Sequence, residues 1–133
     1  MALNALRLAG LAFVSFWFLV GGIGHFVVTE TFAGVTPGWV PFPLLVVLGT
    51  GVLEIAAAAL IWVGSLRRWV GLALIAFCVA VTPVHIEMLM EAERYATLGL
   101  PALWGRLLFQ PVLIAIIWFV TQPRRHARAA DRP

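Results

Sequence analysis

An apolar run from residue 44 to residue 63, broken by one carboxylate at Glu54, constrains this chain more than any other stretch. A run of about 20 apolar residues is the length that an α-helix needs to cross the hydrocarbon core of a bilayer. A carboxylate near the middle of such a helix costs about 2.5–3.5 kcal/mol on insertion scales, so it needs a partner or a proton. We therefore expect Glu54 to face polar groups of other helices rather than lipid.

Composition extends this reasoning to the whole chain. Of the 133 residues, 62% are hydrophobic and 11% are charged, whereas soluble domains are about 45–50% apolar and about 25% charged. A chain this short cannot bury so much apolar surface in a water-soluble core. The sequence predicts an all-α, integral membrane four-transmembrane-helix bundle over residues 1–121, with a basic disordered tail over residues 122–133. The predicted spans are about residues 8–28, 43–63, 69–90 and 102–121.

The arginines predict the topology of this bundle. The net charge of +3 comes with no lysine in the chain. Four spans place both termini and the turn between the second and third spans, with Arg67 and Arg68, on one side, together with Arg7 and the arginines of the tail. The opposite connectors carry most of the glutamates. The positive-inside rule then predicts a multi-pass cell-membrane protein with both termini in the cytoplasm. Anionic membrane lipid is the expected partner of these arginines, and nucleic acid is not.

Two further stretches carry local predictions. Residues 29–43 hold three prolines and two glycines, which break helices, and their aromatic side chains (Phe32, Trp39 and Phe42) predict an interfacial connector. Pro83 is expected to kink the third span. Cys78 is the one cysteine, so an internal disulfide and a CxxC redox pair are excluded for this chain, and a small buried apolar role is expected.

Each predicted span carries a polar side chain at a similar depth below the arginines. At 1.5 Å per helical residue, His25, Glu54 and His85 lie about 27, 20 and 26 Å from the nearest basic turn, and Arg106 and Gln110 about 27 and 21 Å. Polar groups in a bundle turn inward to satisfy one another. We predict a pocket in the outer half of the membrane, with Glu54 paired to Arg106 or a histidine and Gln110 as a neutral cross-link.

Roles for these residues follow from their chemistry, with several alternatives left open. Glu54, His25 and His85 are candidate catalytic groups, because histidines can donate hydrogen bonds and a carboxyl group can relay protons. The candidate ligand-binding residues are Arg106, Gln110, Trp39 and Trp104. The same groups could instead lock the bundle, and the histidines could be solvated near the interface. A metal on His25, Glu54 and His85, or a haem between the histidines, is the weaker alternative, since the chain has no HxxxH or ExxH spacing.

Several short motifs, in order, resemble the DoxX-like family of small membrane proteins. The resemblance covers about residues 10–121 and implies a four-helix membrane bundle. The family takes its name from a subunit of a thiosulfate:quinone oxidoreductase, and other members resemble partners of membrane redox complexes. Its pattern matches His25, Glu54, His85, Arg106 and Gln110 here. The motifs are Gly24-His25-Phe26, Pro37-Gly38-Trp39-Val40-Pro41, Gly51-x-x-Glu54, Leu66-Arg67-Arg68, Thr82-Pro83-Val84-His85-Ile86-x-Met88 and Trp104-Gly105-Arg106-Leu107-Leu108-Phe109-Gln110.

Three functions remain open at the level of sequence. The first is a redox-associated membrane protein whose pocket binds a quinone or another lipophilic small molecule. The second is a membrane-embedded isomerase or other proton-transfer enzyme acting on a lipophilic substrate. The third is a non-catalytic accessory or assembly subunit. The expected partners are membrane lipid, a lipophilic small molecule and a membrane redox protein, and association with further copies of the chain stays open.

Overall fold

The computed structural model describes residues 2–123, and this part of the chain is all-helical. Four of its helices are long and apolar enough to cross a membrane, which agrees with the predicted all-α, multi-pass bundle of four membrane helices. Residues 124–133, which include most of the predicted tail, lie outside the described residues. The helices are α1 (Ala2–Val27), α2 (Thr29–Gly34), α3 (Pro43–Leu60), α4 (Arg67–Met90) and α5 (Leu100–Thr121).

Proline marks the starts of two membrane helices and also lies inside two. Pro43 opens α3 and Pro101 lies in the first turn of α5, where the missing N–H leaves no hydrogen bond unmade. Gly99, just before α5, has a φ of 77°, a conformation that glycine adopts without a steric cost. Pro83 and Pro111 lie within α4 and α5, and both helices continue through them.

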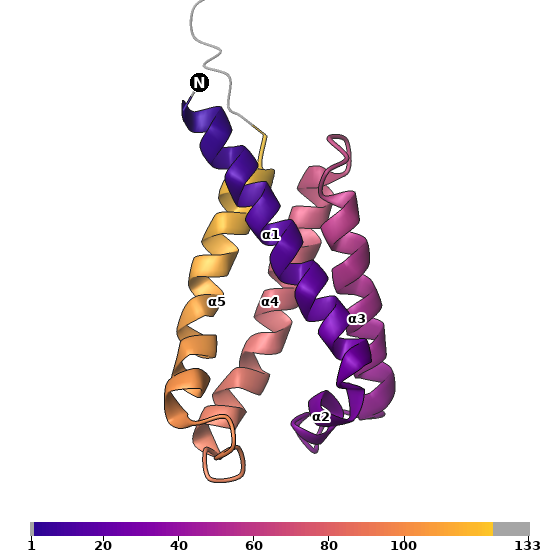
Figure 1. The fold of residues 1–133 in the computed structure, drawn as a ribbon, viewed down its shortest axis with the longest axis vertical. Helices are drawn as coiled ribbons and strands as arrows, with labels where there is room; N and C mark the ends of the chain where they lie inside the picture. Colours follow the sequence, from indigo (N-terminus) through magenta and orange to yellow (C-terminus); the bar gives the residue numbers. More distant parts are fainter. Residues whose placement is uncertain (1, 124–133) are drawn as a thin grey trace, which may run out of the picture.

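Helix α1 crosses the bundle diagonally (Figure 1). Its first half packs against the end of α5, where Gly10 faces Val120. Its second half packs against α3, where Gly22 faces Gly51. Helices α4 and α5 pack against each other as a second pair. The start of α1, the α3–α4 turn and the end of α5 lie at one end of the molecule (Figure 1). We call this the arginine end, after Arg7, Arg67 and Arg68, and the opposite end the connector end.

The hydrophobic core has two parts. The larger part joins all four long helices, and Cys78 is buried in it as a small apolar side chain, 2% exposed. The smaller part, at the connector end, is built on Met88, Tyr95 and Leu103. The buried residues of the larger part are Leu11, Val14, Phe18, Ala57, Ala58, Ile61, Leu74, Cys78, Leu113, Ile117 and Val120.

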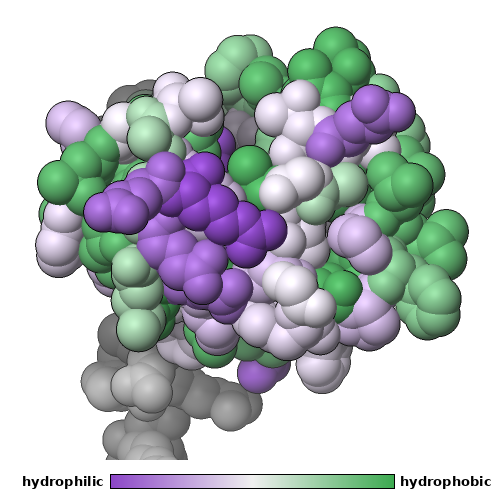
Figure 2. Space-filling model, turned by 90° about the horizontal axis from the view of Figure 1, so that it is seen from below, coloured by the Kyte–Doolittle hydropathy of each residue, from purple (hydrophilic) through white to green (hydrophobic). Residues whose placement is uncertain are grey.

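The connector between the first two spans is more structured than its sequence predicts. Its first six residues form α2, because the helix-breaking prolines all follow Gly34 rather than precede it. Tyr95 then donates a hydrogen bond to the Val35 carbonyl at 3.3 Å, and Trp39 Nε1 donates to Glu87 Oε2 of α4. The two connectors therefore close this end together, and Figure 2 shows a hydrophilic cluster on its surface, surrounded by apolar side chains.

Candidate functional site

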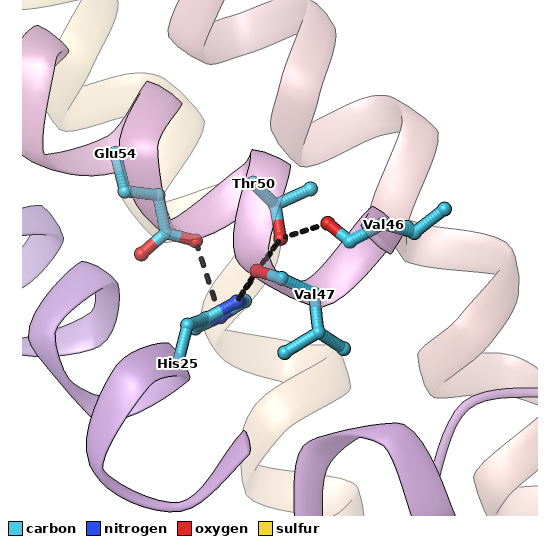
Figure 3. Close-up of polar contacts among 5 residues, drawn as sticks. All are labelled: His25, Val46, Val47, Thr50 and Glu54. Carbon is cyan, nitrogen blue, oxygen red and sulfur yellow. Dashed lines mark hydrogen bonds and ion pairs between the residues drawn. The ribbon is translucent and has the colours of Figure 1, made fainter. Parts of the chain in front are cut away.

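His25 of α1 and Glu54 of α3 meet inside the membrane domain (Figure 3). His25 Nε2 lies 3.7 Å from Glu54 Oε1, and the exposed fractions of the two side chains are only 14% and 9%. Of the two kinds of partner that the sequence predicts for Glu54, the structure therefore supplies a histidine. Glu54 of α3 therefore has its nearest ionisable partner on α1.

The second ring nitrogen of His25 fixes the ring in place. His25 Nδ1 lies 2.8 Å from the Val47 carbonyl oxygen and 3.0 Å from Thr50 Oγ1. Because a carbonyl oxygen can only accept, Nδ1 carries the proton of the neutral ring. The Thr50 hydroxyl donates in turn to the Val46 and Val47 carbonyls, both at 2.9 Å (Figure 3). Nε2 is thereby left as the free ring position, and it faces the carboxyl group of Glu54.

This arrangement makes the pair a site for one exchangeable proton. With Nδ1 committed to Val47, a neutral Nε2 can only accept, so a single proton, carried either by Nε2 or by the Glu54 carboxyl group, gives the pair one donor and one acceptor. The separation of 3.7 Å exceeds the roughly 2.7–3.2 Å of a direct N–H···O hydrogen bond. The two groups are therefore close enough to interact electrostatically but do not form a direct hydrogen bond. Each can still form a hydrogen bond with a third polar group.

Glycines create the space in which the pair sits. A Cβ atom on Gly21 would lie 2.6 Å from Glu54 Oε2, and one on Gly51 would lie 2.8 Å from His25 Cβ. A Cβ atom on Gly22 would lie 2.8 Å from the Gly51 carbonyl oxygen. The backbones of α1 and α3 can approach this closely because all three side chains are absent, as small residues allow in membrane helix pairs. The glycine-rich end of α1 thus positions both functional groups.

Helix α2 covers the histidine from the connector end. The Phe32 ring stacks on the His25 ring, with centroids 4.5 Å apart and an angle of 25° between the planes. Thr29 Oγ1 donates to the His25 carbonyl at 2.7 Å, which holds the start of α2 against the end of α1. His25 is therefore covered by protein, in contrast to the alternative in which it is solvated at the interface.

The remaining sequence-predicted residues lie elsewhere. Arg106 is exposed, and Trp39 and Trp104 are 60% and 47% exposed. Within residues 2–123, Arg106 forms no ion pair with Glu54. His85 is half-buried, and its Nδ1 atom is buried without a hydrogen-bond partner among the described residues. Within residues 2–123, none of these residues forms a hydrogen bond or an ion pair with His25 or Glu54.

Gln110 acts as a neutral cross-link, although not to Glu54. Its side chain is 8% exposed, and Nε2 donates to the Cys78 carbonyl of α4 at 3.4 Å. The Thr82 hydroxyl donates to the same carbonyl at 2.8 Å. Gln110 therefore ties α5 to the turn of α4 that precedes Pro83, where the missing proline N–H weakens the helix's own hydrogen bonding.

Two residues of the site belong to none of the short motifs. Thr50 lies one turn from Glu54 on the same helix face, and this spacing predicts it beside Glu54. Phe32 carries no such signal, because its position over His25 depends on a helix in a segment that reads as a loop.

Metal ligation is not supported by this geometry. In the described part of the chain, no three His, Cys, Asp or Glu side chains are grouped to hold a metal ion.

Comparison with known proteins shows the family of this chain and assigns it no function. No curated protein and no solved structure matches it. Residues 14–121 match a family described as a domain of unknown function, DUF8561. The match runs from the first half of α1 to the last residue of α5, so it includes His25, Thr50 and Glu54. The protein is accordingly a member of the DUF8561 family.

Proposed function

We propose that this protein is a redox-associated membrane protein that binds a quinone, or a lipophilic molecule of similar chemistry, at the His25–Glu54 pair. One observation carries the proposal. An imidazole fixed through Nδ1 presents Nε2 to a buried carboxyl group, 3.7 Å away, within a bundle whose helices are suited to lipid. A pair that shares one proton is well matched to a ligand whose oxygen atoms gain and lose protons.

Quinone chemistry needs what this pair offers. A quinone carbonyl oxygen accepts a hydrogen bond, and each oxygen gains a proton when the ring takes up electrons. Glu54 and His25 can supply the proton for one oxygen and recover it on reoxidation, while the second proton comes from solvent and the electrons come from a partner redox protein. The resemblance to the DoxX-like family supports this association, because that family is named for a subunit of a quinone-coupled enzyme.

The proposal includes a topology with both termini in the cytoplasm of a cell-membrane protein. Arg7, Arg67 and Arg68 lie at one end of the bundle, and Glu91 and Glu93 are exposed on the connector at the other. Basic residues accumulate on the cytoplasmic side of membrane proteins. In this topology α2 and the Trp39 contact lie at the outer surface, and a ligand reaches the pair from the lipid phase.

Quinone titration of the purified full chain in nanodiscs tests the proposal. A benzoquinone with a decyl tail quenches tryptophan fluorescence on binding, and the chain has six tryptophans as reporters. We expect saturable quenching by the wild type and an affinity at least about tenfold weaker for Glu54→Gln, since a hydrogen bond to a charged group is lost. Glu93→Gln is the matched control, because Glu93 is exposed on the α4–α5 connector.

The outcomes of this titration are distinct. Absence of saturable quenching by the wild type rejects the quinone proposal. Equal affinity of the wild type and Glu54→Gln rejects the role of the pair while leaving a quinone site elsewhere in the bundle.

A non-catalytic accessory role is the second candidate, and the glycine packing favours it. Gly21, Gly22 and Gly51 bring the pair into van der Waals contact with both backbones, as a device that locks two helices would require. In this case Glu54→Gln lowers the thermal stability of the chain and its co-purification with a partner. The wild type then shows no binding of quinone.

A further inference from the structure

A cavity of about 690 Å³ lies at the arginine end, far along α1 from the His25–Glu54 pair. It opens between the start of α1, the α3–α4 turn and the end of α5, and none of its described lining residues is acidic. Its volume falls within the roughly 300–1,000 Å³ of small-molecule sites. The lining residues are Asn4, Arg7, Leu8, Leu11, Trp62, Gly64, Arg67, Arg68, Val120, Thr121, Gln122 and Pro123.

Three arginines converge on this cavity from two separate elements. Arg7 comes from α1, and Arg67 and Arg68 form the first turn of α4. None of the three forms an ion pair with a carboxylate among residues 2–123. Like charges that line one cavity repel one another, so an anion bound there relieves a repulsion that no carboxylate of residues 2–123 compensates.

Two of these arginines are held in place by their neighbours. Arg67 Nε donates to the Ile61 carbonyl at 3.1 Å, and one of its terminal nitrogens donates to the Trp62 carbonyl at 3.4 Å. The Arg7 guanidinium lies 5.3 Å above the centre of the Phe119 ring. Both groups therefore have restricted freedom, which lowers the entropy lost when they bind a ligand.

Unused donors point in the same direction. Arg7 Nε and Gln122 Nε2 are both buried, and neither has a hydrogen-bond partner among the described residues. Buried donors are almost always paired in native proteins. Each of these residues lines the cavity, so each has an unused donor beside the place where an acceptor would bind.

The backbone of α4 adds to the positive potential. Arg67 and Arg68 occupy the first turn of this helix, where the aligned peptide dipoles already place partial positive charge. Basic side chains are unfavourable at that position unless an anion is present, and helix N-termini bind phosphate groups readily. A bound anion would offset the unfavourable interaction of both arginines with the helix dipole.

We propose that this cavity binds a phosphate group. The planar guanidinium fork donates paired hydrogen bonds that match phosphate oxygens. Leu8 lines the same cavity and is 58% exposed, so apolar surface is present beside the arginines for the glycerol and acyl parts of a phospholipid. The phosphate can come from an anionic lipid or from solution, and the experiment separates these two sources.

The test is thermal unfolding of the full chain in uncharged detergent, titrated with three compounds. These are short-chain phosphatidic acid, inorganic phosphate and the matching diacylglycerol, which lacks the phosphate. We expect phosphatidic acid to raise the unfolding midpoint saturably. Inorganic phosphate raising it as well identifies the phosphate group alone as sufficient, and its failure to do so identifies a lipid ligand. Equal stabilisation by diacylglycerol overturns the proposal.

Variants locate the effect at this cavity. We expect Arg7→Gln and Arg68→Gln each to weaken the apparent affinity for phosphatidic acid by about tenfold or more, since each removes a charge-assisted hydrogen bond. Arg94→Gln is the control, because Arg94 is an exposed arginine at the connector end, paired with Glu91. Neither cavity variant removes a hydrogen bond to the backbone, so the fold is retained. Wild-type affinity in both cavity variants overturns the proposal, as does an equal loss in Arg94→Gln.

Discussion

At the scale of single residues, His25 holds the site together. Its Nδ1 atom is bound to the Val47 carbonyl, its Nε2 atom faces Glu54, and its ring is stacked under Phe32. Every part of the imidazole therefore has an assigned neighbour, which fixes both its tautomer and its orientation. Such fixation by the second ring nitrogen is what makes a histidine useful as a proton-exchanging group.

A double-mutant cycle of His25→Asn and Glu54→Gln measures the coupling within the pair. The asparagine amide can still donate to Val47 from near the Nδ1 position, so the substitution removes chiefly the Nε2 contact. We expect a coupling free energy of about 1–3 kcal/mol in the unfolding of the protein in detergent, because contacting buried polar groups couple strongly.

The exposed pair Glu91–Arg94 provides the control for this cycle. Its atoms lie 3.3 Å apart, but its side chains are 50% and 51% exposed. Exposed ion pairs contribute about 0–1 kcal/mol. A His25–Glu54 coupling no larger than that of Glu91–Arg94 would show that the buried pair makes no special interaction.

At the scale of helices, the crossing of α1 and α3 is set by glycine rather than by polar attraction. Gly21, Gly22 and Gly51 each face an atom of the opposite helix so closely that a methyl group would collide with it. Packing of this kind is the main source of association between helices in lipid, where the hydrophobic effect between them is weak. The His25–Glu54 pair is therefore brought together by glycine packing between α1 and α3, and this packing does not depend on attraction between the two polar groups.

Gly51→Ala tests this contact against Gly49→Ala in the same helix. A Cβ atom on Gly51 would meet His25, Phe26 and the Gly22 carbonyl, whereas one on Gly49 would meet nothing within 4 Å. We expect Gly51→Ala to lower the free energy of unfolding by about 1–3 kcal/mol through overpacking. Gly49→Ala should leave it unchanged or raise it by up to about 1 kcal/mol, as helix propensity predicts. Helicity followed during denaturation by detergent measures both, and equal effects would contradict the steric account.

The sequence predicts where the helices of this protein lie better than it predicts which face of each helix is buried. Apolar runs of membrane length place α1, α3, α4 and α5, and counting residues from the basic turns places His25 and Glu54 at compatible depth. Depth in the membrane does not decide which of these side chains is buried against another helix. Gln110 and Arg106 lie one turn apart on α5, yet Gln110 is buried against α4 and Arg106 is exposed. Leu103 lies nearer still to the connector end and is buried with Met88 and Tyr95, so the difference depends on which face of α5 its neighbours cover, which is a property of the assembled bundle.

At the scale of the whole molecule, the two ends of the bundle differ in chemistry. The arginine end holds a basic cavity, and the connector end holds exposed glutamates above a small apolar core. A membrane protein with such ends has a strong preference for one orientation, because basic residues are retained in the cytoplasm. The proposed topology places the arginine cavity among the anionic headgroups of the inner leaflet.

Cysteine labelling in intact cells tests this topology. Ser65→Cys lies in the exposed α3–α4 turn, and Glu93→Cys lies in the exposed α4–α5 connector. We expect a membrane-impermeant maleimide to label Glu93→Cys in intact cells and Ser65→Cys only after lysis. The native Cys78 is 2% exposed and provides an unlabelled background. The reverse pattern would invert the proposed orientation.

The diagonal course of α1 has a consequence for how the protein is made. Of the five described helices, α1 leaves the ribosome first, and its partner α5 leaves last. Gly10 can meet Val120 only when the entire membrane domain has entered the bilayer. Until then, the first half of α1 exposes to lipid or to the insertion machinery a surface that its final neighbour will cover. Insertion of α5 is thus the event that closes the bundle, and the arginine cavity, built from the start of α1 and the end of α5, forms at that same moment.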